Sequence, residues 1–466
     1  MTTRHYSPRS VAIVATELTW IPVTLAGAIA LDLARRHVVL LPHQLVEQVA
    51  AVTLLYVAAF YYCNLYDFSG AQLRRELVTA ALLAFSVLAV IFGTLFLWTE
   101  WFQFCSATMI AHWVLTAAFM LVLRTRIGAL LSHFGIVTKI AIFGTGPRAR
   151  QLAEEILSRR ESGHEVCCFV GGRGAAGALE LGKPNPGTVR VPVIPSSALL
   201  EFACQQRLKR ILVATTDLGD ALPVDDLLRC KTEGYEVEDG HTFYERLLGR
   251  ILVADLSPQW LIFSDGFARP ARARAVKRVM DVIGATALLI VNVPLFALLA
   301  LAIKLEDGGP VLFRQTRTGR DGTPFDLYKF RSMRVDAEVE TGPKWAEHGD
   351  PRVTRIGRWI RWLRIDEIPQ AWNVLRGDMS FVGPRPERPE FVATLRTLIP
   401  YYDQRHAVQP GITGWAQVNF PYGATVEDAR QKLEYDLYYL KNFSLLMDAV
   451  IMLRTLKTVF FGLGSR

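Results

Sequence analysis

The segment VKRVMDVIGATALLIVNVPLFALLALAIKLEDG, residues 276–308, decides the architecture of this chain. It holds 22 consecutive residues without a charge, 282–303, enough for a helix that spans a bilayer. Pro294 lies near the middle and removes a main-chain hydrogen bond, so we expect a bend there. Basic residues flank both ends, which favours a re-entrant helix over 281–303 that enters the membrane and returns to the same face. On charge alone, an ordinary kinked span that crosses the membrane stays open.

The composition indicates that part of the 466-residue chain lies in a membrane. Hydrophobic residues make up 51% of it, and its mean hydropathy is positive. The 52 lysines and arginines against 44 acidic residues give a formal net charge of +8. This excess suits a membrane surface, a nucleic acid or a phosphorylated substrate, without choosing among them. The six cysteines show no CxxC spacing, so we expect neither a zinc site nor a disulfide framework.

Four apolar runs lie near the N-terminus, each close to the roughly 20 residues that a spanning helix needs. The first runs into two arginines without a small-residue cleavage pattern, so it is not expected to be a cleaved signal peptide. The lysines and arginines of the loops place both ends of the bundle on the inner side of the membrane, although Arg35 and Arg36 favour the opposite orientation. Glu17 lies in the first run, either near the interface or as a functional intramembrane acid. The runs, which predict a four-helix transmembrane bundle over 1–125, are residues 11–31, 44–63, 77–98 and 104–123.

The next segment changes to alternating strands and helices, which predicts a Rossmann-like α/β domain over 136–255. KIAIFGTGPRARQLAEEIL, residues 139–157, combines an apolar strand, a glycine turn and an amphipathic helix. RILVATT, residues 210–216, predicts another buried strand. Dinucleotide binding needs an acidic residue at the end of the second strand, where this chain has glycines and Arg173. The sequence therefore favours a structural or regulatory domain over a cofactor-binding one.

Residues 309–333, GPVLFRQTRTGRDGTPFDLYKFRSM, predict a β-hairpin with its turn between Gly319 and Gly322. The returning strand carries Lys329 and Arg331 at a spacing of two, which places both on one face. Such a pair is suited to hold one anion through charge-assisted hydrogen bonds. A solvated strand face is the alternative.

The arginine-rich segment that follows leads into two adjacent carboxylates. Arg358, Arg361 and Arg364 alternate with two tryptophans, a pattern typical of a helix that lies in a membrane interface. Asp366 and Glu367 come next, at the start of an expected helix whose first turn can tolerate Pro369 and whose end is marked by Gly377. Carboxylates there stay ionised because of the helix dipole. An ionised Asp is a plausible nucleophile towards a phosphoryl group, and a neighbouring Glu can hold Mg²⁺, but taken alone the pair is also a common capping device.

From Lys277 to the C-terminus, the chain resembles the bacterial sugar transferases, polyprenyl-phosphate hexose-1-phosphate transferases of the monotopic phosphoglycosyl transferase superfamily. Besides the proline-broken helix, the matching blocks are KRVMDV, GPVLFRQTRTG, YKFRSM, DPRVTRIGRWIR, IDEIPQAWNVLRGDMSFVGPRP, QPGITGWAQV and YDLYYLKNFSLLMDAVIMLRT. The preceding bundle and Rossmann-like domain resemble the long members that initiate exopolysaccharide or O-antigen synthesis. The expected fold is therefore a membrane α-helical bundle, a Rossmann-like α/β domain and an α+β monotopic catalytic domain over 276–466 with a re-entrant membrane helix.

The resemblance implies that a hexose 1-phosphate passes from a UDP-hexose to undecaprenyl phosphate and that UMP is released. Asp366 would attack the β-phosphate and form a phosphosugar-aspartyl intermediate. Asp366 and Glu367 would bind Mg²⁺, and Glu367 would also assist proton removal. Pro294 would mark the break in the re-entrant helix. The residues expected to hold phosphates are Lys329, Arg331 and Arg385 of the PRP block.

The resemblance also implies a place and partners. We expect the bacterial inner membrane, with the catalytic domain on the cytoplasmic face and in contact with membrane lipids, and no nucleic-acid partner. The hexose, the ligand of the Rossmann-like domain and a possible homodimer stay open. Many relatives have Gly-Arg soon after WAQV, whereas this chain reads WAQVNFPYGATVEDARQK, so the residue that replaces that arginine is unassigned.

Two rival functions come from other classes. A nucleotide-sugar oxidoreductase or epimerase would use the GTGPRA turn, but the ribose acid and a nearby YxxxK pair are missing. A lipid or polysaccharide transporter would use the four spans, but these offer little polarity beyond Glu17 and His112.

Overall fold

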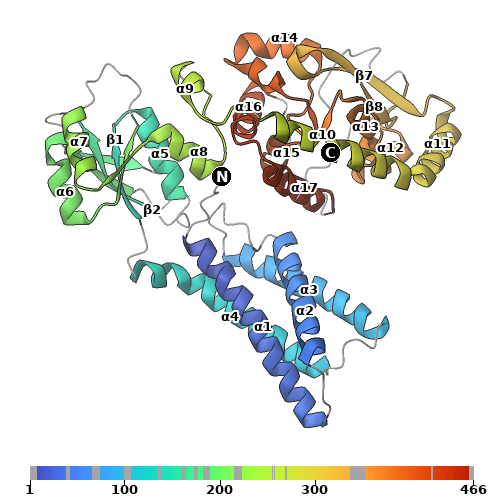
Figure 1. Cartoon of the computed structure of the whole chain (residues 1–466), viewed down its shortest axis with the longest axis horizontal. Helices are drawn as coiled ribbons and strands as arrows, with labels where there is room; N and C mark the ends of the chain where they lie inside the picture. Colours follow the sequence, from blue (N-terminus) through green and yellow to red (C-terminus); the bar gives the residue numbers. More distant parts are fainter. Residues whose placement is uncertain are drawn as a thin grey trace. The chain divides into compact units, whose positions relative to one another are not determined.

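The computed structural model divides the chain into two compact units, Thr3–Leu247 and Leu248–Arg466 (Figure 1). Each unit is described by itself. The structure describes residues 8–37, 42–63, 65, 74–98, 106–133, 138–158, 164–172, 177–181, 189–214, 223–253, 256, 258–267, 270–335, 352–420, 423 and 425–460.

Four long helices at the start of the first unit confirm the four apolar runs: α1 (Pro8–Arg36), α2 (Pro42–Tyr62), α3 (Arg74–Trp98) and α4 (Ser106–His133). Three stretches are long and apolar enough to cross a membrane: Ala12–Arg35, Pro42–Tyr62 and Ala107–Arg124. The described part of α3 adds a shorter apolar helix, Ala80–Phe92. The chain is therefore a membrane-associated protein.

Glu17 lies in the core of these helices. Its side chain is 2% exposed, and its Oε1 lies 3.0 Å from Nη2 of Arg124 on α4. Arg124 also donates a hydrogen bond to the carbonyl of Leu65. An isolated charge is costly in an apolar environment, so this pairing explains how α1 and α4 tolerate two buried charges.

The rest of the first unit is an α/β domain built on a six-stranded mixed sheet. Five strands run parallel, and β3 pairs with its neighbour antiparallel at one edge, in the order β3-β4-β2-β1-β5-β6. Apolar side chains of β1, β2 and β5 pack against the flanking helices. Figure 1 shows the helices of this domain beside the sheet. The strands are β1 (Thr138–Phe143), β2 (His164–Gly171), β3 (Gly177–Leu181), β4 (Val189–Pro195), β5 (Arg210–Val213) and β6 (Glu236–Asp239). The helices are α5 (Pro147–Ser158), η2 (Ser196–Ala198), α6 (Leu199–Gln206), α7 (Val224–Thr232) and α8 (Gly240–Leu248).

The sequence predicted the strands at 139–143 and 210–213 and the glycine turn between β1 and α5. Gly144 has φ of +116° there, a conformation that favours glycine. Arg173, which takes the place of the expected ribose acid, lies outside the described residues. The α/β class is thus confirmed, and binding of a dinucleotide is untested.

The second unit begins with a bent pair of apolar helices, α10 (Ala271–Val291) and α11 (Val293–Asp307). The two axes differ by 58°, and the break lies at Asn292. Pro294 is in the first turn of α11, where its missing N–H is tolerated, but it cannot continue the ladder of α10. Asn292 Nδ2 donates to the carbonyl of Leu288 over 2.8 Å and so closes the last turn of α10. The predicted bend is present, two residues before the proline.

A small α+β body follows. The predicted hairpin consists of β7 (Leu312–Thr318) and β8 (Pro324–Phe330), joined through η3 (Arg320–Gly322). A second, parallel pair consists of β9 (Ser380–Val382) and β10 (Gly411–Thr413). At 16 residues, α17 is shorter than the roughly 20 residues that a spanning helix needs. The helices of this body are α9 (Pro258–Phe263), α12 (Arg355–Trp362), η4 (Ile365–Glu367), α13 (Gln370–Arg376), α14 (Pro389–Leu398), η5 (Tyr402–Ala407), α15 (Trp415–Asn419), α16 (Val426–Lys441) and α17 (Leu445–Phe460).

The KRVMDV block fixes α10 to this body through three side chains. Lys277 Nζ lies 2.6 Å from Oδ2 of Asp448 on α17. Arg278 donates to two carbonyls at the end of α13, and Oδ1 of Asp281 accepts from the N–H of Phe381 over 3.2 Å. The bent helix pair is therefore attached to the elements that carry the candidate site.

Candidate active site

A short turn places the two adjacent carboxylates between α12 and α13. Arg364 adopts a left-handed conformation, with φ of +54°, and reverses the chain after α12. Asp366 and Glu367 then lie in η4, Pro369 precedes the first residue of α13, and Gly377 ends that helix with φ of +92°. The predicted order of carboxylates, proline, helix and glycine is confirmed.

The buried side chain of Asn373 fixes the hairpin to α13. Its Oδ1 accepts from the N–H of Tyr328 over 3.1 Å, and its Nδ2 donates to the carbonyl of Asp326 over 2.7 Å. Because both partners lie on β8, this amide aligns the strand that carries Lys329 with the helix that follows Glu367. The sequence analysis missed this residue, since a single Asn inside a helix carries no distinctive signal.

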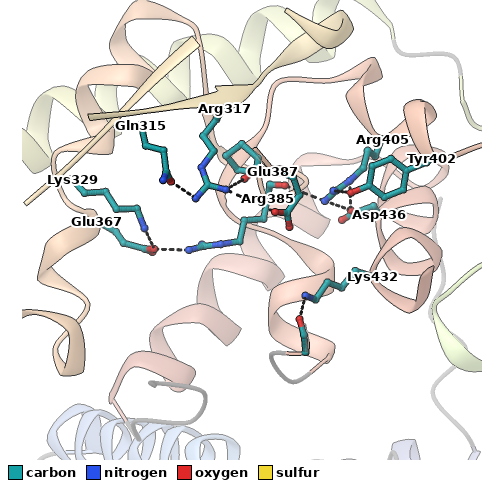
Figure 2. A network of polar contacts seen from close by, with 12 residues as sticks. Gln315, Arg317, Lys329, Glu367, Arg385, Glu387, Tyr402, Arg405, Lys432 and Asp436 are labelled. Carbon is teal, nitrogen blue, oxygen red and sulfur yellow. Dashed lines mark hydrogen bonds and ion pairs between the residues drawn. The ribbon is translucent and has the colours of Figure 1, made fainter. Parts of the chain in front are cut away.

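Glu367 is the centre of the site, where it binds two cations from distant segments (Figure 2). Its Oε1 accepts from Nζ of Lys329 over 2.9 Å and from Nη2 of Arg385 over 2.7 Å. Burial alone would raise the pKa of Glu367, but Arg385 and Lys329 together lower it well below its usual value. The structure therefore brings together three residues that the sequence singled out, and it keeps Glu367 ionised.

Asp366 has a different environment from its neighbour. No described side chain or main-chain group donates a hydrogen bond to its carboxylate. Burial raises the pKa of Asp366 above its usual value, Glu367 adds to this rise, and nearby cations such as Lys329 and Arg361 oppose it. The first turn of α13 does not include the two carboxylates, because this helix begins only at Gln370, and their pKa values shift in opposite directions.

Arg331 does not contact the same carboxylate as Lys329. It donates to Asp307 at the end of α11 and is 5% exposed. The reason is that β8 ends at Phe330, so the alternation of a strand no longer applies to Arg331. Two of its nitrogens, Nε and Nη1, are buried without a hydrogen-bond partner in the described part of the chain. The expectation that Lys329 and Arg331 hold one anion together stays a prediction.

The arginine-rich segment forms α12 and leads directly into the site. Oε1 of Glu306, on α11, accepts from the N–H groups of Arg355 and Ile356 over 2.7 and 3.3 Å, which caps the start of α12. Trp359 and Trp362 are 67% and 56% exposed, in keeping with the expected interfacial face. The bent helix pair is thus linked through α12 to the carboxylates.

The described residues contain no group of three or more metal-binding side chains. Mg²⁺ is often held by one or two carboxylates together with substrate phosphates, so a site completed by a bound diphosphate suits this pair. Among the described residues none donates a hydrogen bond to Asp366, and both cations on Glu367 share a single oxygen. These two residues therefore suit Mg²⁺ only together with a phosphorylated substrate.

The cation that replaces the expected arginine after WAQV is not identified by its contacts. Residues 421, 422 and 424 lie outside the described part of the chain. Arg430 is engaged by two glutamates of its own helix, Glu427 and Glu434. Lys432 Nζ donates to the carbonyl of Gly423 over 2.7 Å (Figure 2).

Comparison with known proteins finds several that are similar to this chain. Residues 272–462 match the model of a family described as bacterial sugar transferase. A relative from Aeromonas hydrophila, UDP-N-acetylgalactosamine-undecaprenyl-phosphate N-acetylgalactosaminephosphotransferase, is 45% identical over 52% of this chain and 56% of its own length. Undecaprenyl-phosphate glucose phosphotransferase from Komagataeibacter xylinus is 33% identical over 80% of this chain and 69% of its own. The Rhizobium leguminosarum exopolysaccharide production protein PSS is 43% identical over 39% of this chain and 92% of its own.

Proposed function

This chain belongs to the bacterial sugar transferase family, and from that premise we propose that it transfers a hexose 1-phosphate from a UDP-sugar to undecaprenyl phosphate and releases UMP. The observation that carries the proposal is the Asp366 carboxylate, which accepts no hydrogen bond from the described part of the chain, beside Glu367 with its two cations. The relatives support the class of reaction through their names, and the site supplies a chemical route.

The first step uses Asp366 as the nucleophile. A carboxylate oxygen of Asp366 forms a bond to the β-phosphorus of the UDP-sugar. The bond from that phosphorus to the oxygen bridging the two phosphates breaks, and UMP leaves with the electron pair. The product is an acyl phosphate between Asp366 and the sugar phosphate.

The second step restores the enzyme. An oxygen of undecaprenyl phosphate attacks the same phosphorus, and the bond to the Asp366 carboxylate breaks. Undecaprenyl diphosphate sugar is formed, and Asp366 is again a free carboxylate. Because one residue accepts and then releases the sugar phosphate, both substrates use one site in turn.

Lys329 and Arg385 supply positive charge where the diphosphate binds. Cations fixed in advance stabilise the charge that builds up on a phosphoryl group during transfer. Glu367 is ionised and binds both cations through one oxygen. Its negative charge offsets the repulsion between the two positive charges. Asp366 and Glu367 are the residues that would hold Mg²⁺ together with diphosphate oxygens, and the ion would further neutralise charge there.

We further propose that α10 and α11 form a re-entrant helix and that the transferase unit lies on the cytoplasmic face of the inner membrane. The 58° bend, the basic residues at both ends and the exposed tryptophans of α12 support this arrangement. In this arrangement the site is open to a cytosolic UDP-sugar and to the headgroup of a membrane-bound lipid phosphate.

The test is UMP release by the purified protein with undecaprenyl phosphate, Mg²⁺ and a panel of UDP-sugars. Multiple-turnover release that needs both the lipid phosphate and one particular sugar would establish the reaction and identify the donor. A folded protein that releases no UMP from any UDP-hexose or UDP-N-acetylhexosamine would contradict the proposal.

A further inference from the structure

The loop that carries Arg385 is held by its main chain. Residues 383–388 lie between β9 and α14 and belong to no helix or strand. Four successive carbonyls of this loop nevertheless accept hydrogen bonds from other elements. Those of Arg385 and Pro386 accept from Nη2 of Arg405 over 3.0 Å and from Nη1 of Arg317 over 3.2 Å (Figure 2). Those of Pro384 and Glu387 accept from the N–H groups of Gly411 and Thr318, each over 2.9 Å.

Arg405 is itself immobilised by a buried cluster. It is 5% exposed, its Nε lies 3.0 Å from Oδ2 of Asp436 on α16, and its Nη1 donates to the Tyr402 hydroxyl over 2.7 Å. Burial opposes its charged form, but Tyr402 and Asp436 raise the pKa of Arg405, so the guanidinium stays charged. A buried ion pair is weak support for stability because of its desolvation cost. The third contact of Arg405, with the carbonyl of Arg385, therefore points to a role of this buried cluster in holding the loop.

Arg385 is thus fixed at both ends. Arg405 holds its carbonyl, and Glu367 accepts from its guanidinium. Lys329 needs no such support, because the ladder of β7 and β8 already fixes its backbone. The Arg385 side chain is still 36% exposed, so a bound anion can reach it.

We propose that Arg405 is a positioning residue for the donor site: by holding the Arg385 carbonyl, it sets the place at which the Arg385 guanidinium meets the diphosphate of the UDP-sugar. The proposal rests on the proposed function, and it assigns to Arg405 no contact with substrate. Arg317 supports the next carbonyl of the same loop from β7.

The experiment is a double-mutant cycle between Arg405→Lys and Arg385→Gln, read as UMP release. Lysine keeps the charge beside Asp436 but cannot reach all three acceptors of Arg405 at once. We expect Arg405→Lys to lower kcat/KM for the UDP-sugar about 100-fold, mainly through the donor KM, with the KM for undecaprenyl phosphate unchanged. Added to Arg385→Gln, it should cause no further loss. Losses that multiply, or an unchanged donor KM, would overturn the proposal.

A milder variant decides the matter if Arg405→Lys does not fold. Tyr402→Phe removes one hydrogen bond to Arg405 and keeps the ring, and we expect a roughly fivefold loss in the same parameter. Tyr401→Phe is the matched control, because its hydroxyl contacts the carbonyl of Leu256 instead. A purely structural role would lower the melting temperature in both variants without a selective change in donor KM.

Hydrogen exchange provides a readout that needs no activity. Amides of residues 383–388 should exchange faster in Arg405→Lys and Tyr402→Phe than in wild type, with Tyr401→Phe unchanged. If wild type releases no UMP from any UDP-sugar, the proposed reaction fails, whereas equal exchange in all four proteins shows that Arg405 does not hold this loop.

Discussion

At the residue scale, the site separates two neighbouring carboxylates by what each one contacts. Glu367 accepts hydrogen bonds from Lys329 and Arg385, so it stays ionised. Asp366 has no described donor, and burial raises its pKa. A carboxylate without hydrogen bonds is less stabilised as an anion and therefore more available for attack. Glu367 thus holds the two cations in place, and Asp366 is the carboxylate that we propose as the nucleophile.

The nucleophile assignment predicts that Asp366→Asn abolishes turnover. The amide cannot form the acyl phosphate, so UMP release should fall at least about a thousandfold. The measurement is the initial rate of UMP release at saturating donor, with thermal unfolding as the check that the variant is folded. A folded variant that keeps a rate close to wild type would rule out the covalent intermediate on this residue.

Arg361 and Glu367 have opposite effects on the pKa of Asp366, which predicts opposite pH shifts in two variants. Asp366 must be ionised to attack, so the rate should fall as pH drops through a pKa above the usual aspartate value of about 3.9. Arg361 lowers the pKa of Asp366, so Arg361→Gln should move this acid limb to higher pH. Glu367 raises it, so Glu367→Gln should move the limb to lower pH. The pH profiles of kcat test both signs, and shifts in the same direction would contradict the assignment.

At the scale of the element, two carboxylates of α11 link the bent helix pair to the site. Glu306 caps α12, which continues into η4, and Asp307 binds Arg331 just after β8. The helix α11 is therefore joined to both segments that supply the candidate site residues. This attachment keeps the site at a fixed place relative to α11.

The helix cap predicts a measurable loss in Glu306→Gln. A neutral amide is a weaker acceptor for the N–H groups of Arg355 and Ile356, so the free energy of unfolding should fall by about 1 kcal/mol. Glu390→Gln, in the first turn of α14, is a control without such a contact among the described residues. Chemical denaturation of both variants in detergent tests this. An equal loss in the free energy of unfolding would show that Glu306 does not cap α12.

The bend at Asn292 predicts a topology that Pro294 helps to maintain. Alanine restores the N–H that proline lacks, so Pro294→Ala should straighten the helix pair. A C-terminal tag should be reached only from the cytoplasmic side in wild type and partly from the other side in the variant. A wild-type tag that is reached only from outside would exclude the re-entrant arrangement.

At the scale of the whole molecule, the candidate site lies entirely within the second unit, Leu248–Arg466. The Rhizobium relative matches 39% of this chain over 92% of its own length, so a relative much shorter than this chain exists. We therefore expect residues 248–466, expressed in membranes, to keep UMP release within about tenfold of the full chain. A folded but inactive fragment would show that the first unit takes part in the reaction.

The sequence by itself determined the features that depend on neighbours along the chain. The apolar runs predicted α1 to α4, and the glycine turn predicted the start of the α/β domain. Pro294 predicted the bend, and the order of Asp366, Pro369 and Gly377 predicted the turn before α13. These features follow from hydropathy, main-chain hydrogen bonds and restricted φ angles, all of which act over a few residues.

Only the tertiary structure decided which charged groups meet. Lys329 and Arg385 are 38 and 18 residues from Glu367 in sequence, and the hairpin and the loop after β9 bring them to one oxygen. β8 ends at Phe330, and the structure places Arg331 against Asp307, a contact that the sequence did not predict. Neither Asn373 nor Arg405 carries a local signal. Ion pairs between distant segments depend on how the whole chain packs, and no local pattern in the sequence contains that information.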